Sequence, residues 1–94
     1  FLILRAVGES KGFAVAVPDD AIDSARDEVA KKEGLLLCPE GAATYAAFKQ
    51  ELASGRIAKD ERVVLFNCGS GLKYPMPAAD ASVDMNATID YAKL

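Results

Sequence analysis

The stretch RVVLFNCGSGLKYP, residues 62–75, decides the predicted fold of this chain. It begins with a continuous apolar run, Val63 to Phe66, which predicts a strand buried on both faces. The run leads into a small polar turn, Asn67 to Gly71, whose two glycines can adopt backbone angles closed to other residues. If the strand belongs to an open parallel sheet, this turn lies at the carboxyl edge, where α/β folds bind their ligands. We therefore expect the functional site here, with Cys68 at its centre.

The rest of the chain alternates between helical and extended patterns. Three apolar runs predict short strands, at residues 13–17, 35–38 and 63–66. Helical patterns precede or separate these runs, at residues 1–10, 19–33 and 39–54. This order predicts an α/β fold, a three-layer βαβαβ arrangement around a mostly parallel sheet. We expect residues 1–77 to form this unit, and residues 78–94 to be a C-terminal tail that packs on a neighbouring surface or is partly disordered.

Composition excludes several functions. The chain has 94 residues, a net charge of −3 and a pI near 4.8, so we expect no nucleic-acid partner. No apolar stretch approaches the roughly 20 residues of a membrane span, so no membrane contact is expected. There is no histidine, which removes imidazole metal sites and Ser–His or Cys–His pairs, and we predict no metal site. Two cysteines are too few for a secreted disulfide framework, and they predict a reducing, cytoplasmic location.

Cys38 and Cys68 each follow a predicted strand at the same edge of the sheet. If those strands are neighbours, their Cβ atoms are expected within about 10 Å of each other. The alternative is a pair of buried, inert thiols. The turn at residues 69–73 could bind an anion through consecutive backbone N–H groups, but it lacks the spacing of a phosphate loop, so a plain turn is the alternative.

Residues 68–75, CGSGLKYP, resemble the C-terminal signature of threonine synthases, Thr-Gly-x-Gly-Leu-Lys-x-Pro after an apolar strand. The likeness covers about residues 4–77. It implies the C-terminal part of the large domain of a fold-type II pyridoxal-phosphate enzyme, a lyase that converts O-phosphohomoserine and water to threonine and phosphate. Another fold-type II enzyme, a serine or threonine dehydratase, is an alternative, although such enzymes tend to have Gly-Gly-Asn where Gly71-Leu72-Lys73 stands. A non-catalytic α/β binding module is a second alternative.

The resemblance implies a role for the turn in binding pyridoxal 5'-phosphate. Cys68 occupies the position of a Thr or Ser that hydrogen-bonds the pyridine nitrogen of the cofactor, and Asn67 and Gly69 are expected to contact the cofactor beside it. A thiol can donate weakly to an unprotonated ring nitrogen. A neutral donor leaves the ring less positively charged than a carboxylate would, which suits elimination and replacement chemistry. Cys38 stands where the family often has Glu, and the role of Glu40, two positions later, stays open.

The resemblance also implies that catalysis needs residues outside this stretch. The lysine that carries the cofactor and the glycine-rich phosphate loop lie upstream in such enzymes, so no catalytic residue is expected here. The expected partners are the remainder of the same enzyme chain, a small amino-acid substrate and a second copy in a homodimer. The chain does not begin with methionine, which suggests part of a longer protein, and we expect four apolar side chains to pack on another chain or copy: Phe1, Leu2, Val83 and Ile89.

Overall fold

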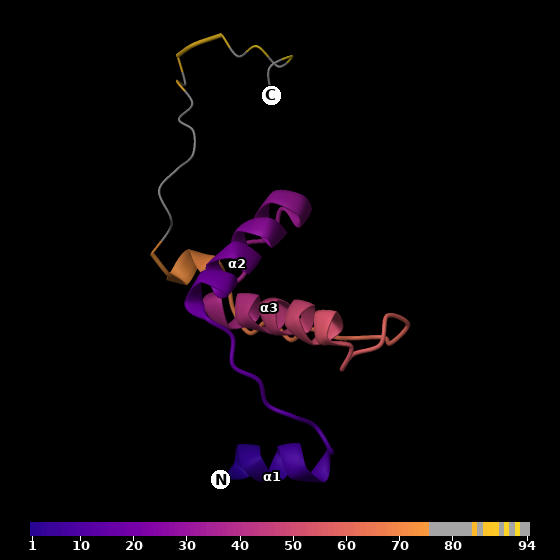
Figure 1. The fold of residues 1–94 in the computed structure, drawn as a ribbon. Coiled ribbons are helices and arrows are strands. Elements are labelled where there is room, and N and C mark those ends of the chain that lie inside the picture. Colours follow the sequence, from indigo (N-terminus) through magenta and orange to yellow (C-terminus); the bar gives the residue numbers. More distant parts are fainter. Residues whose placement is uncertain (76–83, 85, 89, 91, 93–94) are drawn as a thin grey trace.

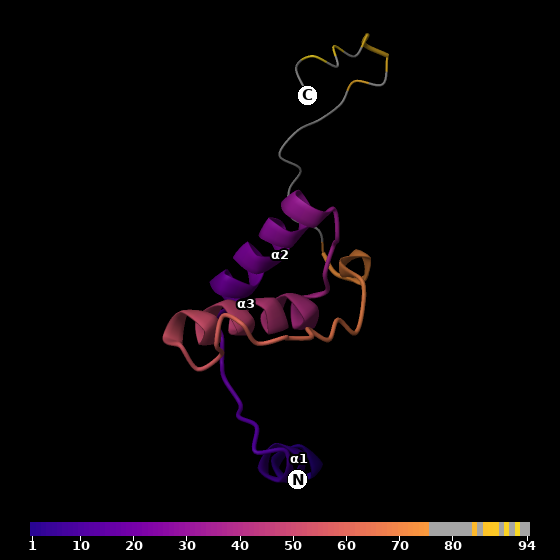
Figure 2. The same cartoon turned by 90° about the vertical axis from the view of Figure 1, so that its right-hand side faces the viewer.

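In a computed structural model, the chain is described at residues 1–75, 84, 86–88, 90 and 92. These residues form three α-helices and a short 3₁₀ helix: α1 (Leu2–Glu9), α2 (Asp19–Glu33), α3 (Pro39–Ser54) and η1 (Gly71–Lys73). Helices α2 and α3 pack against each other, while α1 stands apart at the end of an extended connection (Figure 1 and Figure 2). Most of the predicted tail at 78–94, including Val83 and Ile89, lies outside the described residues. No helix in the described part is long and apolar enough to cross a membrane.

The two packed helices match their predicted bounds. Each ends at a glycine in the left-handed conformation, Gly34 with φ 67° and Gly55 with φ 77°, as expected for helix C-termini. Helix α2 carries acidic residues in its first turn and lysines in its last, a distribution that complements the helix dipole. Helix α3 has Pro39 in its first turn, where the missing N–H has no helical partner to lose.

The core is small and lies between α2 and α3. Its buried apolar residues are Ala25, Leu37, Ala42 and Ala46. Four larger side chains pack around them from the sides: Val17, Ile22, Val29 and Tyr45. The small residues let the backbones approach closely. The buried alanines of α3, Ala42 and Ala46, pack against helix α2.

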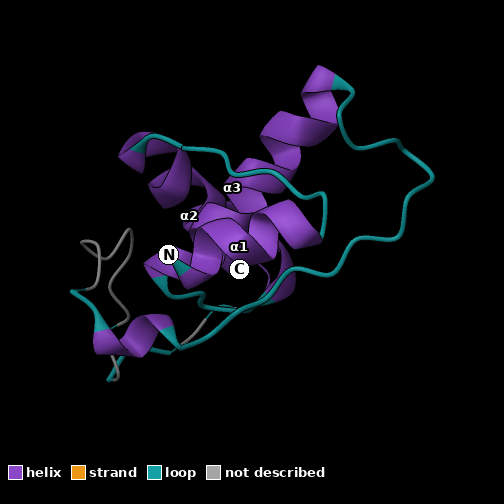
Figure 3. Cartoon of the chain, turned by 90° about the horizontal axis from the view of Figure 1, so that it is seen from below, coloured by secondary structure: helices purple, strands orange, loops and turns teal. Residues whose placement is uncertain are grey.

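The prediction of a three-layer α/β fold with a mostly parallel sheet is wrong for the described residues. No strand forms within them, and the one β-bridge is an isolated antiparallel pair, Leu37 with Ser70. Figure 3 shows helices joined by loops. The predicted strand at residues 63–66 is extended but unpaired, and it runs beside α3 (Figure 2).

Exposure along this stretch explains the error. Val63 and Leu65 are 36% and 39% exposed and line a shallow cavity with residues of α3, whereas Val64 and Phe66 are 86% and 77% exposed. Alternation of this kind means that one face of an extended segment is covered and the other is open. An apolar run shows that a segment is extended and suited to burial, but it does not supply a partner in register, and a sheet needs that partner.

A carboxylate network links the two packed helices on their exposed side. Glu28 of α2 accepts hydrogen bonds from Lys32 at 2.8 Å and from Lys49 of α3 at 2.5 Å, and the Tyr45 hydroxyl donates to it at 3.3 Å. The hydrogen bonds from Lys32 and then Lys49 lower the pKa of Glu28 from 4.5 to about 2. The ionised form is therefore favoured in the folded chain.

This network predicts a pH dependence of stability. Because the pKa of Glu28 is lower in the folded state, its contribution should be complete above pH 4.5 and be lost as the pH falls toward 2. We expect Glu28→Gln to remove this part of the pH dependence when the free energy of unfolding of the full-length protein is measured between pH 2 and 7. Glu33→Gln, the same change on the same helix at a carboxylate that accepts neither of the lysine hydrogen bonds made to Glu28, is the control. Identical pH profiles for the wild type and Glu28→Gln would contradict the role of Glu28.

Candidate functional site

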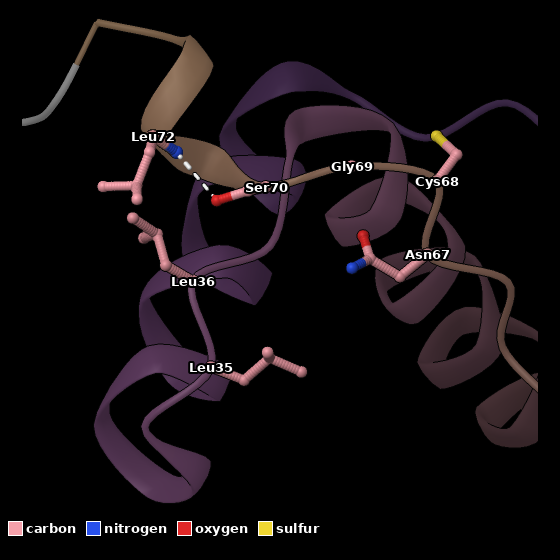
Figure 4. A pocket seen from close by; sticks show the side chains of 7 residues that line it. All are labelled: Leu35, Leu36, Asn67, Cys68, Gly69, Ser70 and Leu72. Atoms are coloured by element: carbon pink, nitrogen blue, oxygen red, sulfur yellow. Dashed lines mark hydrogen bonds between the residues drawn. The ribbon is translucent and has the colours of Figure 1, made fainter.

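Two segments far apart in the sequence meet beside the start of α3 and form the candidate site. The first is residues 35–38, between α2 and α3, and the second is the turn at residues 67–73. The backbone N–H of Gly71 donates to the carbonyl of Leu36 at 3.1 Å, next to the bridge between Leu37 and Ser70. The two segments line an open cavity of about 530 Å³ (Figure 4): Leu35, Leu36, Asn67, Cys68, Gly69, Ser70 and Leu72. The predicted turn therefore lies at a cavity, although the described residues contain no sheet whose edge could place it there.

The second glycine of the turn is required by the close approach of the two segments. A Cβ atom on Gly71 would lie 2.6 Å from the carbonyl oxygen of Leu37 and 2.7 Å from Cγ of Leu36. Both distances are shorter than real carbon contacts, and one involves backbone that cannot rotate away. A Cβ on Gly69 would meet its nearest neighbour, Nζ of Lys73, at 3.5 Å, an ordinary contact. Lys73 thus folds back over the turn.

The two cysteines lie in contact at the start of α3. Their Sγ atoms are 3.9 Å apart, and both are free thiols. Cys38 is buried, with 1% of its surface exposed, whereas Cys68 is exposed. The predicted proximity of the pair is confirmed, while its predicted cause, two neighbouring strands, is wrong.

The buried thiol caps helix α3. Sγ of Cys38 accepts a hydrogen bond from the backbone N–H of Gly41 at 3.3 Å, which satisfies one of the donors that a helix start leaves free. Its own S–H can donate to Oδ1 of Asn67 at 3.5 Å, so the cap also contacts the turn. Sequence reasoning missed this role. The available signal was the position of Cys38 directly before a proline that begins a helix.

The exposed thiol stays protonated. Hydrogen bonding with the Cys38 thiol, and then removal from water, raise the pKa of Cys68 above its usual value of 9.0, and the charge of Glu40 adds to the shift. At neutral pH the side chain therefore keeps an S–H, which is a weak hydrogen-bond donor.

A second polar contact fixes the far end of the turn. The hydroxyl of Tyr74 lies 2.9 Å from each carboxylate oxygen of Glu40, in the first turn of α3. The backbone N–H at the helix start and then this hydroxyl lower the pKa of Glu40, and the carboxylate in turn raises the pKa of Tyr74. Glu40 therefore helps to hold the turn, a structural role that the sequence did not predict.

The turn offers little to an anion. The backbone N–H groups of residues 71–73 all have partners: Leu36 carbonyl for Gly71, the Ser70 hydroxyl for Leu72 at 3.3 Å, and the Ser70 carbonyl for Lys73 at 3.4 Å. The geometry thus agrees with the plain turn and not with a phosphate loop. Among the described residues no group of three or more acidic or cysteine side chains could hold a metal ion.

Comparison with known proteins shows the family to which the chain belongs. Residues 1–69 match the family of pyridoxal-phosphate dependent enzymes, and the chain belongs to this family. It is similar to threonine synthases: 42% identical over 79 residues to that of Methanocaldococcus jannaschii, covering 84% of this chain and 20% of the relative. The threonine synthase of Halalkalibacterium halodurans is 35% identical over 86 residues, which cover 92% of this chain and 24% of the relative. That of Methanosarcina acetivorans is 34% identical over 90 residues, which cover 93% of this chain and 22% of the relative.

These findings confirm the resemblance recognised at residues 68–75. The chain spans about a fifth to a quarter of the length of these relatives. No solved structure matches it significantly.

The glycines of the turn give a matched pair of variants. Gly71→Ala should lower the free energy of unfolding of the full-length protein by about 1–3 kcal/mol, because the new methyl group overlaps the Leu37 carbonyl. Gly69→Ala should change it by less than about 0.5 kcal/mol, because its methyl group finds ordinary contacts. Urea unfolding measures both. Equal effects of the two substitutions would contradict the close approach at Gly71.

Proposed function

We propose that this chain forms the pyridine-nitrogen side of the cofactor site in a threonine synthase-like, pyridoxal-phosphate dependent lyase. The observation that carries the proposal is Cys68, an exposed residue of the turn that lines the cavity, with a thiol held in its protonated form. The reaction is the conversion of O-phosphohomoserine and water to threonine and phosphate. Family membership and the similarity to threonine synthases support this choice over a serine or threonine dehydratase.

The residues of the cavity fit an aromatic cofactor ring. Three leucines, at positions 35, 36 and 72, provide apolar surface. The cavity has a volume of about 530 Å³, which lies within the usual range for small-molecule sites. Cys68 supplies a neutral donor for the ring nitrogen, while Asn67 and Gly69 lie on either side of it along the chain. When bound, the cofactor supplies an electron sink for carbanion chemistry. A neutral donor leaves the ring without a full positive charge, which favours elimination and replacement.

We assign binding, and no proton transfer, to these residues. The Asn67 amide oxygen accepts from Cys38, which fixes the orientation of its side chain beside the ring. The contact of Tyr74 with Glu40 keeps the turn against α3, so the donor of Cys68 stays in place. Catalytic residues are expected in the remainder of the enzyme chain.

The proposal includes the partners and the setting of the chain. Residues 1–77 would be the C-terminal part of the enzyme's large domain and residues 78–94 its tail. Helix α1 buries none of its residues, and Phe1 before it and Leu2 at its start are both exposed, so we propose that the remainder of the same chain covers this helix. We also propose a homodimer, an amino-acid substrate and a cytoplasmic location, the last because two cysteines are too few for a secreted disulfide framework.

Cofactor binding by Cys68 variants of the full-length protein tests the proposal. Loss of one hydrogen bond in Cys68→Ala should weaken binding about threefold to tenfold and shift the absorbance band of the bound cofactor. Cys68→Ser restores a neutral donor and should recover most of the affinity. The measurement is a titration with pyridoxal 5'-phosphate followed by absorbance.

Two outcomes would overturn parts of the proposal. Equal affinity and an unchanged band for Cys68→Ala would leave Cys68 a structural thiol. A full-length protein that binds no cofactor at all would favour the non-catalytic binding module.

A further inference from the structure

The contact between Cys38 and Cys68 has a chemical consequence beyond cofactor binding. One thiol is buried and the other is exposed, and their sulfurs are 3.9 Å apart. A disulfide bond is about 2.05 Å long, so the two sulfurs must approach by about 1.9 Å. Within the described residues, Cys68 lies at the end of an extended stretch with no strand beside it.

We propose that Cys38 and Cys68 form a reversible intramolecular disulfide when a peroxide oxidises the protein. The pair is a site for oxidative modification in which Cys68 reacts first and Cys38 resolves. The disulfide would remove the S–H donor of Cys68 that the cofactor contact needs, a consequence that rests on the proposed function. The covalent step itself does not depend on the cofactor.

The order of events follows from exposure. The thiolate of Cys68 attacks one oxygen of hydrogen peroxide, the O–O bond breaks, and Cys68 becomes a sulfenic acid while hydroxide takes a proton to give water. The Cys38 thiolate then attacks the Cys68 sulfur, the S–S bond forms, and the second hydroxide leaves as water. Two thiols lose two electrons and two protons, and one peroxide is reduced to two waters. Cys38 is too buried to meet the oxidant directly.

Oxidation would also change the start of α3. The Cys38 S–H donates to Oδ1 of Asn67, and the disulfide removes this donor. A disulfide sulfur can still accept weakly, so the hydrogen bond from the Gly41 N–H can persist. The modification is therefore expected to act on the turn without unfolding the helix.

Peptide mapping of the full-length protein tests the covalent step. Trypsin cuts after Lys32, Lys49, Arg62 and Lys73, so it releases Cys38 in peptide 33–49 and Cys68 in peptide 63–73. After treatment with hydrogen peroxide and blocking of free thiols, we expect these two peptides to be joined, and dithiothreitol to separate them. The rate should rise by about tenfold per pH unit below the raised pKa of Cys68, because the thiolate is the reacting form.

Two serine variants control for the roles of each thiol. Cys38→Ser keeps an oxygen that can cap α3, so the helix should remain, and Cys68 should then progress to sulfinic acid because no resolving thiol is present. Cys68→Ser should leave Cys38 reduced at the same peroxide concentration. Sulfinic acid on Cys68 of the wild type with Cys38 still reduced would overturn the proposal, as would disulfides formed only with other cysteines or between chains.

The effect on the cofactor is measured separately. The oxidised protein should bind pyridoxal 5'-phosphate as weakly as Cys68→Ala does, with recovery after dithiothreitol. A joined peptide pair with unchanged cofactor binding supports the disulfide and overturns the contact of Cys68 with the ring. Weaker cofactor binding by Cys68→Ala without any joined peptide supports the contact and overturns the disulfide.

Discussion

Cys38 is the point at which helix α3 begins and at which the turn of residues 67–73 is held. Its buried sulfur accepts from the helix, while its S–H faces Asn67 and the thiol of Cys68. A buried polar group must find partners, and here the partners belong to two segments that are about thirty residues apart in the sequence. Around this contact the Leu36–Gly71 hydrogen bond and the Tyr74–Glu40 contact close the turn onto the start of α3. Together these contacts hold in place the two segments that line the cavity.

The same sulfur pair explains the character of the Cys68 side chain. A thiol that shares a hydrogen bond with a second thiol, near a carboxylate, loses part of its tendency to ionise. This keeps the donor that a neutral contact to a cofactor ring requires. It also places a second sulfur 3.9 Å away, so the same arrangement underlies both the proposed cofactor contact and the proposed disulfide. A Thr or Ser at this position, the usual residue in the family that the turn resembles, would provide the first property without the second.

The packing of α2 on α3 supports the site. The apolar core between these helices is small. It consists of three alanines and one leucine, with larger side chains half covered at the sides. Four large apolar side chains are exposed in the described part of the chain: Phe1 and Leu2 at the start of α1, and Val64 and Phe66 on the outer face of the extended stretch. Exposed apolar surface of this kind is typical of interaction surfaces. It is consistent with a chain that spans only a fifth to a quarter of its relatives.

The sequence alone determined the bounds of α2 and α3, because proline, glycine and charge placement act locally. It also pointed to the turn at residues 67–71, because the signature from Cys68 to Pro75 is specific. Tertiary structure decided what the extended stretches pair with: Val63 and Leu65 lie on helix α3, with no strand beside them in the described residues. It also decided that Cys38 caps a helix and that Tyr74 reaches Glu40. Local patterns fix the conformation of a segment. Strand pairing and long-range contacts depend on which surfaces meet in the folded chain, and the spacing of apolar residues along the sequence does not specify those surfaces.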